Sequence, residues 1–404
     1  MKEQIHLPKC KGIINKHNPP GVKDSELNLF GDDVISDVLT FQKSHPLYTN
    51  TPLISLNQLA KRLNVKSIHV KDESHRFGLN AFKVMGGIYA VGKYLADQLN
   101  KDINELSFEE LKSADVKQKV GEITFISATD GNHGRGIAWA ARELGQKSII
   151  YLPKESTKAR LEAIRNEGAH AEIKDMNYDA TVKLSADLAK EKGYVIVQDT
   201  AWQGYEEIPL WIMQGYAAIA KEIADETKEV PTHLILQAGV GSFAAGIAAY
   251  YLKRYGNQAP KLMIVEPNLA DCYYQSLNSP NQEITPVTGK MNSIMAGLCC
   301  GEPNLTAYQL LKKYAYASFS CEDKLAALGM RVLGHPLRGD ERIISGESGA
   351  VPLGLLYYLM EDGKKDDLAA LELNEQSKIL MISTEGDTDP EAYLDVVWKG
   401  HYSN

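Results

Sequence analysis

The sequence predicts an α/β protein built on doubly wound parallel sheets. Short apolar runs alternate with longer stretches of helical periodicity along the 404 residues, which is typical of repeated β–α units. The short runs are apolar at successive positions, as in strands that helices cover on both faces. A chain of this length accommodates two domains or one large α/β unit.

Seven short apolar segments are predicted to be strands. They are residues 67–70 (SIHV), 123–128 (ITFISA), 148–152 (SIIYL), 194–197 (YVIV), 233–237 (HLILQ), 262–266 (LMIVE) and 379–383 (ILMIS). The helices predicted between them include residues 82–99 and 161–169, whose apolar positions follow a helical period. The charged stretch 102–122 is expected to be a surface insertion with a short helix.

Composition and charge exclude several classes of partner. A formal net charge of −8 argues against nucleic acid and anionic membranes. No apolar stretch approaches the roughly 20 residues that a membrane helix needs. Residues 1–12 lack the apolar core of a signal peptide. We therefore expect a cytoplasmic protein with neither a nucleic-acid partner nor a membrane partner.

The cysteine pattern agrees with that compartment. The five cysteines are Cys10, Cys272, Cys299, Cys300 and Cys321. Their number is odd and none has CxxC spacing, which favours reduced thiols. We expect no disulfide and no metal site.

Lys83 lies within an apolar, glycine-containing run, residues 78–87 (GLNAFKVMGG). Such a lysine is either an ordinary residue on a helix surface or a buried one whose amine is used. Burial disfavours the ammonium form, so a buried Lys83 would be easier to keep neutral. Taken alone, the stretch favours the surface lysine.

Residues 129–133 (TDGNH) follow the predicted strand 123–128 and lead into an amphipathic helix. Sheets of this class bind ligands at the carboxyl ends of their strands, and the amides of a helix start can bind an anion. A helix capped by Asp130 or Asn132 explains the same residues without a ligand. Taken alone, the stretch favours the capped helix.

Two further loops follow predicted strands. Gly239, Gly241 and Ser242 open a helix after residues 233–237, and glycines allow backbone N–H groups to approach phosphate oxygens. This loop has neither a Walker lysine nor GxGxxG spacing, so it does not predict a nucleotide or dinucleotide site. The segment 384–390 (TEGDTDP) ends the last strand and by itself is consistent with a polar turn.

Taken in order, these four motifs resemble those of fold-type II pyridoxal-phosphate enzymes, the group of tryptophan synthase β and threonine dehydratase. The resemblance covers most of the chain from about Thr51 onward. The stretches NAFKVMGG, SATDGNHGRG, WQGYEEIPLWIMQGY, SGESGA and STEGDTDP are similar to those of the diaminopropionate ammonia-lyases within that group. The generic loop reads SAGNH, so Thr129 and Asp130 replace a serine and an alanine here. A carboxylate therefore stands where dehydratases of hydroxy-amino acids have a methyl group.

The resemblance implies two doubly wound α/β domains with pyridoxal 5'-phosphate between them. We expect residues 1–88 and 176–404 to form the large, cofactor-binding domain and residues 89–175 to form the small one. The implied partners are a small amino-acid substrate and, by family analogy, a second copy of the chain in a homodimer.

The implied activity is that of a carbon–nitrogen lyase in amino-acid catabolism. It is the pyridoxal-phosphate-dependent α,β-elimination of D- and L-2,3-diaminopropionate to pyruvate and ammonia. A serine/threonine dehydratase or a β-replacing synthase of the same fold is the alternative, and Asp130 argues against both. A non-catalytic cofactor carrier and a dinucleotide-dependent dehydrogenase are more distant alternatives.

The resemblance also assigns cofactor contacts. Lys83 is expected to hold the cofactor as a Schiff base. The other residues expected to bind the cofactor are Phe82, Asn132, Gly239, Val240, Gly241, Ser242 and Thr384. Among these, the glycine loop is expected on the phosphate, Asn132 on the phenolic oxygen of the ring and Thr384 on the pyridine nitrogen.

Substrate contacts are expected from Thr129, Asp130, Gly131, His133 and Asp199. Lys83 and Asp130 are the expected catalytic residues. Two bases on opposite faces would explain the use of both isomers, with Lys83 serving the L isomer and Asp130 the D isomer. Asp199 is a second candidate contact for the substrate ammonium, with a turn cap as the alternative. Two alternatives stay open for His133, which either tunes Asp130 or caps the helix. Glu347 and Ser348 are expected near the ring, without an assigned role.

Overall fold

Two sheets organise the computed structural model, which describes residues 3–15, 25–227 and 229–403. The strands are β1 (Glu3–Leu7), β2 (Cys10–Ile14), β3 (Leu53–Ser55), β4 (Ser67–Asp72), β5 (Thr124–Ala128), β6 (Lys147–Leu152), β7 (His170–Ile173), β8 (Val195–Ile196), β9 (His233–Gln237), β10 (Lys261–Pro267), β11 (Ala315–Cys321) and β12 (Lys378–Ser383). The larger sheet has the order β1-β2-β11-β10-β9-β12-β4-β3, and the smaller has the order β7-β6-β5-β8. The predicted α/β class is confirmed.

Helices surround both sheets. They are α1 (Asp32–Lys43), α2 (Asn57–Arg62), α3 (Val84–Gln98), α4 (Phe108–Lys112), α5 (Ala114–Val120), α6 (Asn132–Glu143), α7 (Lys158–Asn166), α8 (Tyr178–Lys192), α9 (Glu207–Glu226), α10 (Ser242–Tyr255), α11 (Cys272–Asn278), α12 (Leu305–Tyr314), α13 (Asp323–Gly334), α14 (Glu347–Asp362), α15 (Lys365–Leu371) and α16 (Pro390–Val397). The short 3₁₀ helices are η1 (Ser25–Phe30), η2 (Glu73–Gly78), η3 (Ile103–Glu105), η4 (Gly256–Gln258) and η5 (Ala296–Leu298).

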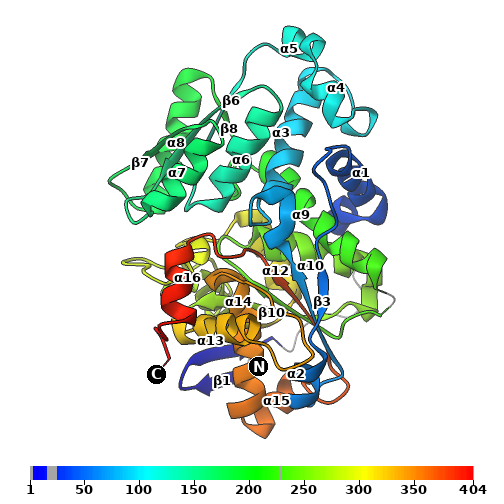
Figure 1. Ribbon diagram of the computed structural model, residues 1–404, viewed down its shortest axis with the longest axis vertical. Coiled ribbons are helices and arrows are strands. Elements are labelled where there is room, and N and C mark those ends of the chain that lie inside the picture. The colour runs from blue at the N-terminus through cyan, green and yellow to red at the C-terminus, as the bar shows by residue number, and fades with distance from the viewer. Residues whose placement is uncertain (1–2, 16–24, 228, 404) are drawn as a thin grey trace.

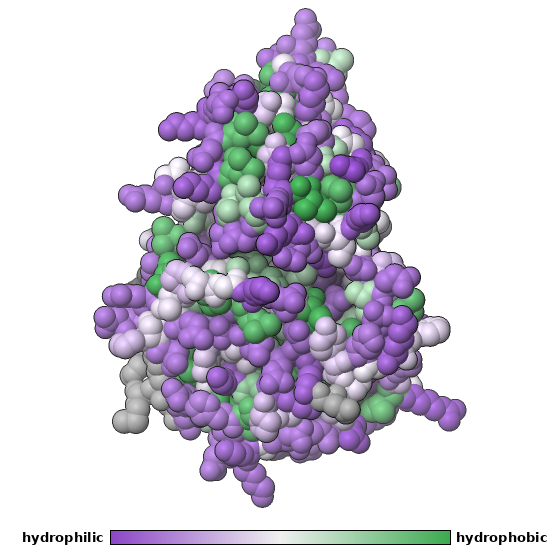
Figure 2. Space-filling model, turned by 90° about the vertical axis from the view of Figure 1, so that its left-hand side faces the viewer, coloured by the Kyte–Doolittle hydropathy of each residue, from purple (hydrophilic) through white to green (hydrophobic). Residues whose placement is uncertain are grey.

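The smaller sheet and its helices α6, α7 and α8 form the upper lobe of the molecule, and the larger sheet lies in the lower lobe (Figure 1). Pairing is parallel from β11 through β10, β9 and β12 to β4, and antiparallel at both edges of the larger sheet. The smaller sheet is parallel throughout. Figure 2 shows that the molecule tapers toward the upper lobe and carries small groups of apolar side chains among hydrophilic ones.

The central strands are buried on both faces. In β9, Leu234 and Leu236 join the apolar core that includes α1, α3, α9 and α10, whereas Ile235 joins the core of α2, α13, α14 and α16. Residues of β12 alternate in the same way. Successive side chains of a strand point to opposite faces, so the continuous apolar runs in the sequence reflect two helical layers.

All seven predicted strands are present, and five others were not predicted. β11 has the sequence AYASFSC, in which small and polar residues interrupt the apolar run that identifies a buried strand, so this strand was missed. The helix predicted at 161–169 lies at Lys158–Asn166, and the chain then enters β7. The insertion 102–122 contains the two short helices α4 and α5 rather than one, and Phe108 and Leu111 of α4 are buried.

A glycine pair brings α3 close to both lobes. A side chain on Gly87 would meet the backbone of Gly136 in α6 at 3.1 Å, and one on Gly86 would meet Tyr216 of α9 at 2.7 Å. Because neither glycine has a side chain, α3 packs closely against α6 on one side and α9 on the other. The position of Lys83, at the start of α3, is thereby fixed relative to both lobes.

The expected domain boundaries stay a prediction. The smaller sheet continues past residue 175, through α8 to Ile196 in β8. Among the described residues no helix is both long and apolar enough to span a membrane. All five cysteines are free.

Candidate active site

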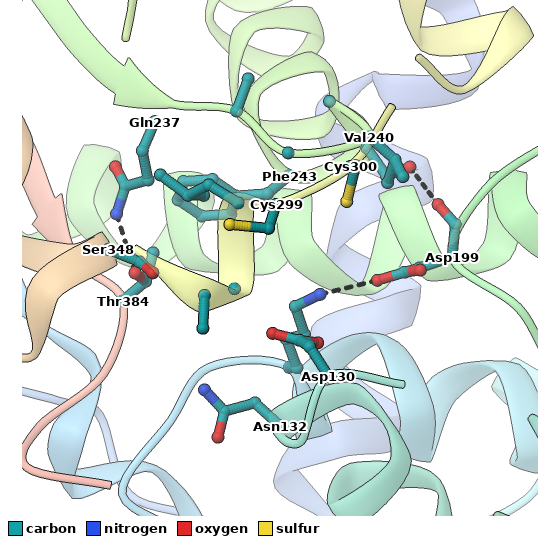
Figure 3. Close-up of a pocket in the computed structure, with 18 of the residues that line it drawn as sticks. Asp130, Asn132, Asp199, Gln237, Val240, Phe243, Cys299, Cys300, Ser348 and Thr384 are labelled. Atoms are coloured by element: carbon teal, nitrogen blue, oxygen red, sulfur yellow. Dashed lines mark hydrogen bonds and ion pairs between the residues drawn. The ribbon is translucent and has the colours of Figure 1, made fainter. Parts of the chain in front are cut away.

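A cavity lies where β9 and β12 of the larger sheet end, facing the start of α6 from the upper lobe (Figure 3). Ten predicted site residues line it: Phe82, Lys83, Asp130, Asn132, Asp199, Gly239, Val240, Gly241, Ser242 and Thr384. Thr129, Gly131 and His133 are not among the lining residues. The position agrees with the rule that open α/β sheets bind ligands at the carboxyl ends of strands.

Lys83 is largely buried and forms an ion pair at the cavity wall. Its Nζ donates to Asp199 Oδ2 at 2.8 Å, and 15% of its side chain is exposed. Burial lowers the pKa of Lys83, but the carboxylates of Asp199 and Asp130 outweigh burial and raise it above its ordinary value. Lys83 is therefore not a surface lysine, and burial disfavours its charged form as expected, but the two facing carboxylates favour that form more strongly. The sequence motif could not show that two carboxylates face the amine.

Asp199 is buried beneath Lys83. Burial raises its pKa, but His133 and Lys83 lower the pKa to about 2. His133 Nδ1 lies 3.8 Å from Asp199 Oδ2, while its Nε2 donates to the carbonyl of Val197 at 2.9 Å. Tyr178 Oη donates to Asp199 Oδ1 at 3.4 Å. Asp199 is therefore a buried anion beside the lysine amine rather than a turn cap.

The TDGNH turn is organised by Thr129. Its Oγ1 accepts hydrogen bonds from the amides of Gly131 and Gly134, both at 2.9 Å. The N-cap position of α6 is Gly131, which has no side chain, and the side chain that accepts from the first turn of the helix is that of Thr129. The interpretation of Asp130 or Asn132 as the N-cap is therefore wrong, as is the capping alternative for His133. Because Thr129 accepts the hydrogen bonds of the turn, the side chains of Asp130 and Asn132 are not needed as caps and line the cavity instead.

Asp130 points into the cavity (Figure 3). Its carboxylate has no hydrogen-bond partner within the described parts of the chain, although its backbone carbonyl accepts from Arg160 Nη1 at 3.5 Å. It is close enough to influence the pKa of Lys83. A carboxylate held beside an amine in this way can attract a cationic group or accept a proton.

The glycine loop fits a phosphate group. Gly241 has a φ of +91°, and a Cβ there would lie 2.0 Å from Tyr273 Oη, so only glycine fits. Tyr273 Oη donates to the carbonyl of Val240 at 2.9 Å and fixes the loop from behind. Ser242 begins α10, whose first amides and dipole favour an anion. Ser242 Oγ donates to the backbone carbonyl of Asp199, which ties the loop to the carboxylate beneath Lys83.

Thr384 and Phe82 are neighbours in the cavity wall, because the Phe82 amide donates to the Thr384 carbonyl at 3.0 Å. Thr384 Oγ1 accepts from Gln237 Nε2 at 2.8 Å. The Phe82 ring lies 4.6 Å from the Phe243 ring and 4.7 Å from the Tyr216 ring, with both pairs tilted. Phe82 therefore belongs to an aromatic cluster as well as to the cavity wall. The structure thus offers an amine, an anion cradle, a hydroxyl and a ring around one space, which fits pyridoxal phosphate.

Several lining residues were not predicted. They include Tyr178, Gln237, Phe243, Cys299, Cys300 and Glu385. Glu385 follows Thr384 directly and accepts from Asn132 Nδ2 at 2.5 Å. Glu385 is adjacent in sequence to Thr384, which was a predicted cofactor contact. If the strand had continued, however, the side chain of Glu385 would point to the opposite face of the sheet from that of Thr384. The chain leaves the strand at Ser383, so this rule no longer applies.

Two buried carboxyl groups stand near this part of the wall. Burial raises the pKa of Glu385, Arg160 and the Asn132 amide lower it, and Asp130 raises it, with a net upward shift. Burial and the nearby Glu385 raise the pKa of Glu347, at the start of α14, to about 7. Ser348 lines the cavity as expected, whereas Glu347 is not among the lining residues.

Comparison with known proteins supports the resemblance. Residues 45–385 match the family model described as "Pyridoxal-phosphate dependent enzyme". The diaminopropionate ammonia-lyase of Salmonella typhimurium is 50% identical over 380 residues, which cover 93% of this chain and 94% of the relative. The L-serine dehydratase of Dictyostelium discoideum is 25% identical, over 81% of this chain and 86% of the relative.

Solved structures give the same result. The diaminopropionate ammonia lyase of Escherichia coli in complex with D-serine matches with a TM-score of 0.90 and 45% identity, over 98% of each chain. The threonine deaminase isoform 2 of Solanum lycopersicum matches with a TM-score of 0.72 at 18% identity, over 99% of this chain and 100% of the other. The second likeness concerns the fold alone.

Proposed function

The chain belongs to the pyridoxal-phosphate-dependent enzyme family, and we propose that it eliminates ammonia from D- and L-2,3-diaminopropionate to give pyruvate. The relatives with 50% identity along nearly the whole chain support this reaction. The observation that carries the proposal is the Asp130 carboxylate, which has no partner among the described residues and lies in the cavity wall beside the Lys83–Asp199 ion pair. A dehydratase acting on an uncharged hydroxyl group has no need of this second carboxylate.

The described residues fit the cofactor at four points. We assign the Lys83 amine to its aldehyde, residues 239–242 to its phosphate, Asn132 to its phenolic oxygen and Thr384 to its pyridine nitrogen. When bound, pyridoxal phosphate supplies an electron sink for the negative charge that develops at the substrate α-carbon. Phe82 is assigned to the wall beside the ring.

Proton transfer is assigned to two side chains. Lys83 Nζ takes the α-proton of the L isomer, and the Asp130 carboxylate takes that of the D isomer. Asp199 stabilises the ammonium form that Lys83 acquires when it takes the proton, since its Oδ2 lies 2.8 Å from Nζ. An amine leaves readily only when it is protonated. The negative charges of Asp130 and Asp199 therefore favour the reactive ammonium form of the substrate β-nitrogen.

The TDGNH turn is assigned to the substrate. Gly131 opens the turn and His133 lies in the first turn of α6, while Thr129 holds the turn in shape by accepting from the amides of Gly131 and Gly134. The amides at this helix start would receive the substrate carboxylate. Because Thr129 Oγ1 is already engaged, we assign it to shaping the turn rather than to direct contact.

Hydroxy-amino acids are the second candidate substrates. The solved complex of the E. coli relative with D-serine and the identity to an L-serine dehydratase favour including them. The test is pyruvate release from D- and L-diaminopropionate, D- and L-serine and L-threonine by the purified holoenzyme. We expect both diaminopropionate isomers to give the highest kcat/KM. A higher value for serine or threonine would contradict the proposal.

Lys83→Ala provides the catalytic control. The variant should lose turnover of every substrate, because the amine that holds the cofactor and moves the proton is gone. It should also lose covalent trapping of the cofactor by borohydride. Pyruvate release at the wild-type rate would refute the assignment of Lys83.

The assembly and the compartment are also part of the proposal. Family resemblance favours a homodimer, and the cysteine pattern favours the cytoplasm. Sedimentation equilibrium of the holoenzyme tests the first, with a monomer mass contradicting it. Residues 1–88 and 176–404 were expected to form the large domain and residues 89–175 the small one, and we propose that the small domain also includes α8 and β8, which extend the smaller sheet to Ile196.

A further inference from the structure

Asn132 is the first residue of α6 in the upper lobe, but its amide is held by the lower lobe. Its Nδ2 donates to Glu385 Oε2 at 2.5 Å. Both residues line the cavity. Figure 3 shows the amide nitrogen of Asn132 turned toward the cavity and its oxygen turned away.

Glu385 is itself fixed. Only 5% of it is exposed, and its backbone pairs with Ala81, two residues before Lys83. Its backbone carbonyl accepts from the amide of Gly346 at 3.0 Å, and a Cβ on Gly346 would approach its Cγ at 2.9 Å. The carboxyl group therefore has little freedom to move away from Asn132.

The chemistry of this contact selects one orientation of the amide. A side-chain amide has a donating end and an accepting end, whereas a carboxylate only accepts. A carboxylate at this place therefore holds the Nδ2 end and rejects the carbonyl end. Nδ2 has a second N–H, which stays available to a ligand in the cavity.

We propose that Glu385 is a positioning residue that holds Asn132 so that it offers an N–H, and not its carbonyl, to the phenolic oxygen of the cofactor. This inference rests on the proposed function through the assignment of Asn132. An N–H donor stabilises the deprotonated phenolic oxygen, whereas a carbonyl would favour the protonated form. The two forms differ in their absorption, and the protonated form absorbs at shorter wavelength.

The test compares Glu385→Gln, Asn132→Ala and the double variant as holoenzymes. Glutamine keeps the shape, but it donates as well as accepts and so no longer selects one amide orientation. In Glu385→Gln the cofactor band should move toward shorter wavelength, as in Asn132→Ala. kcat/KM should fall roughly 10–100-fold, the usual loss when a residue that orients a ligand-binding group is changed.

The double variant separates positioning from a merely structural role. If Glu385 acts through Asn132, adding Glu385→Gln to Asn132→Ala should change neither the band nor kcat/KM by more than about twofold. Independent, multiplying losses would overturn the proposal. If Glu385→Gln lowered only the Tm and left the absorption band unchanged, the proposal would also be overturned. That result would mean that Glu385 stabilises the contact between the lobes but does not orient the Asn132 amide.

Acid pH gives a further readout. The raised pKa of Glu385 implies that its carboxylate is lost at higher pH than that of an ordinary glutamate, with Arg160, Asp130 and Glu347 as the charged groups around it. As the pH falls, the wild-type band should approach that of Glu385→Gln, while the band of the variant should lack this change. A wild-type band that does not respond contradicts the proposal.

Asp387→Asn is the matched control. Asp387 lies two residues away in the same loop and accepts from Asn80 Nδ2 at 3.1 Å, outside the cavity wall. Its band should match that of the wild type. If Glu385→Gln does not fold, Glu385→Asp, which withdraws the carboxylate by one methylene, should show the same band shift. If the wild type releases no pyruvate from diaminopropionate, the proposed function fails, but the absorption measurements still decide this inference.

Discussion

At the residue scale, the site is defined by two carboxylates that face one amine. Asp199 is bonded to Lys83, whereas Asp130 has no hydrogen-bond partner among the described residues. The bonded carboxylate stabilises charge on the lysine. The unbonded one is available to a substrate, and this difference between two chemically identical groups assigns them different roles.

Asp130→Asn tests that difference. The change removes a proton acceptor with almost no change in shape, so the D isomer should lose roughly 10²–10⁴-fold in kcat. The L isomer should lose less, because Lys83 still serves its face of the substrate. Steady-state pyruvate release from each isomer is the measurement. Equal small losses would show that Asp130 has no part in proton transfer, and equal large losses would indicate shared substrate binding.

Glu347→Gln should change the pH dependence of stability. The pKa of Glu347 is raised to about 7 from 4.5. Its contribution to stability is therefore fully present below about pH 4.5 and is lost as the pH rises through about 7. A shift of this size corresponds to about 3 kcal/mol. The wild type should lose about that much of its free energy of unfolding, relative to the variant, between about pH 5 and about pH 8.5.

Urea unfolding of both proteins at the two pH values measures this effect. The variant should be less stable relative to the wild type at acid pH than at alkaline pH. A difference between the two proteins that is the same at both pH values would mean that Glu347 titrates normally.

At the element scale, the start of α10 depends on one glycine. Gly241 combines a left-handed backbone with a Cβ position that Tyr273 fills. Both features leave no room for a side chain at this position of the loop. The proposed anion cradle is therefore a property of the loop and the helix together, not of any polar side chain.

Gly241→Ala should reduce cofactor retention more than it reduces folding. The left-handed backbone costs an alanine about 1–2 kcal/mol, and the contact with Tyr273 displaces the loop further. Gly193→Ala, at the C-terminal end of α8, is the control because its φ is +70° and nothing lies within 4 Å of the added Cβ. Cofactor absorbance after dialysis and Tm are the measurements. Equal cofactor content in both variants would contradict the cradle.

At the scale of the whole molecule, a buried charge network supports the loop that leads to Lys83. Glu222 of α9 accepts from Arg76 Nη1 at 2.8 Å and lies 3.0 Å from Lys71 Nζ of β4. Glu73 pairs with the same Arg76 at 2.8 Å. All four side chains are fully buried. The network joins the sheet, η2 and α9 just before the segment that carries the lysine.

Glu222→Gln should destabilise the fold by about 3–5 kcal/mol, because it leaves a buried cation without its partner. Glu226→Gln is the control, since Glu226 lies on the same helix, 4.0 Å from Lys71, with 46% of its side chain exposed. That change should cost at most about 1 kcal/mol. Urea unfolding measures both variants. Similar losses in the two would show that the network contributes no more than a surface pair.

The sequence by itself determined the fold class, the family and about half of the cavity wall. β9 and β12 were predictable because each is buried on two faces and therefore reads as a continuous apolar run. Lys83, the TDGNH turn and the glycine loop were predictable from their order along the chain, since the motifs taken together resemble those of a known family. A local sequence pattern reflects interactions between residues that are close in the chain, and the conformation of these motifs depends mainly on such interactions.

Only the tertiary structure decided which distant groups meet. β11 is a strand although its sequence has no apolar run. Its pairing with β2 and β10 holds it in the sheet. Glu385 and Asn132 are 253 positions apart, and Lys83 and Asp199 are 116 apart, so no periodicity or spacing relates them. The effect of the two carboxylates on the pKa of Lys83 could not be predicted for the same reason. A pKa depends on the groups that surround the amine in space, and the neighbours of Lys83 in sequence are apolar whereas its neighbours in space are carboxylates.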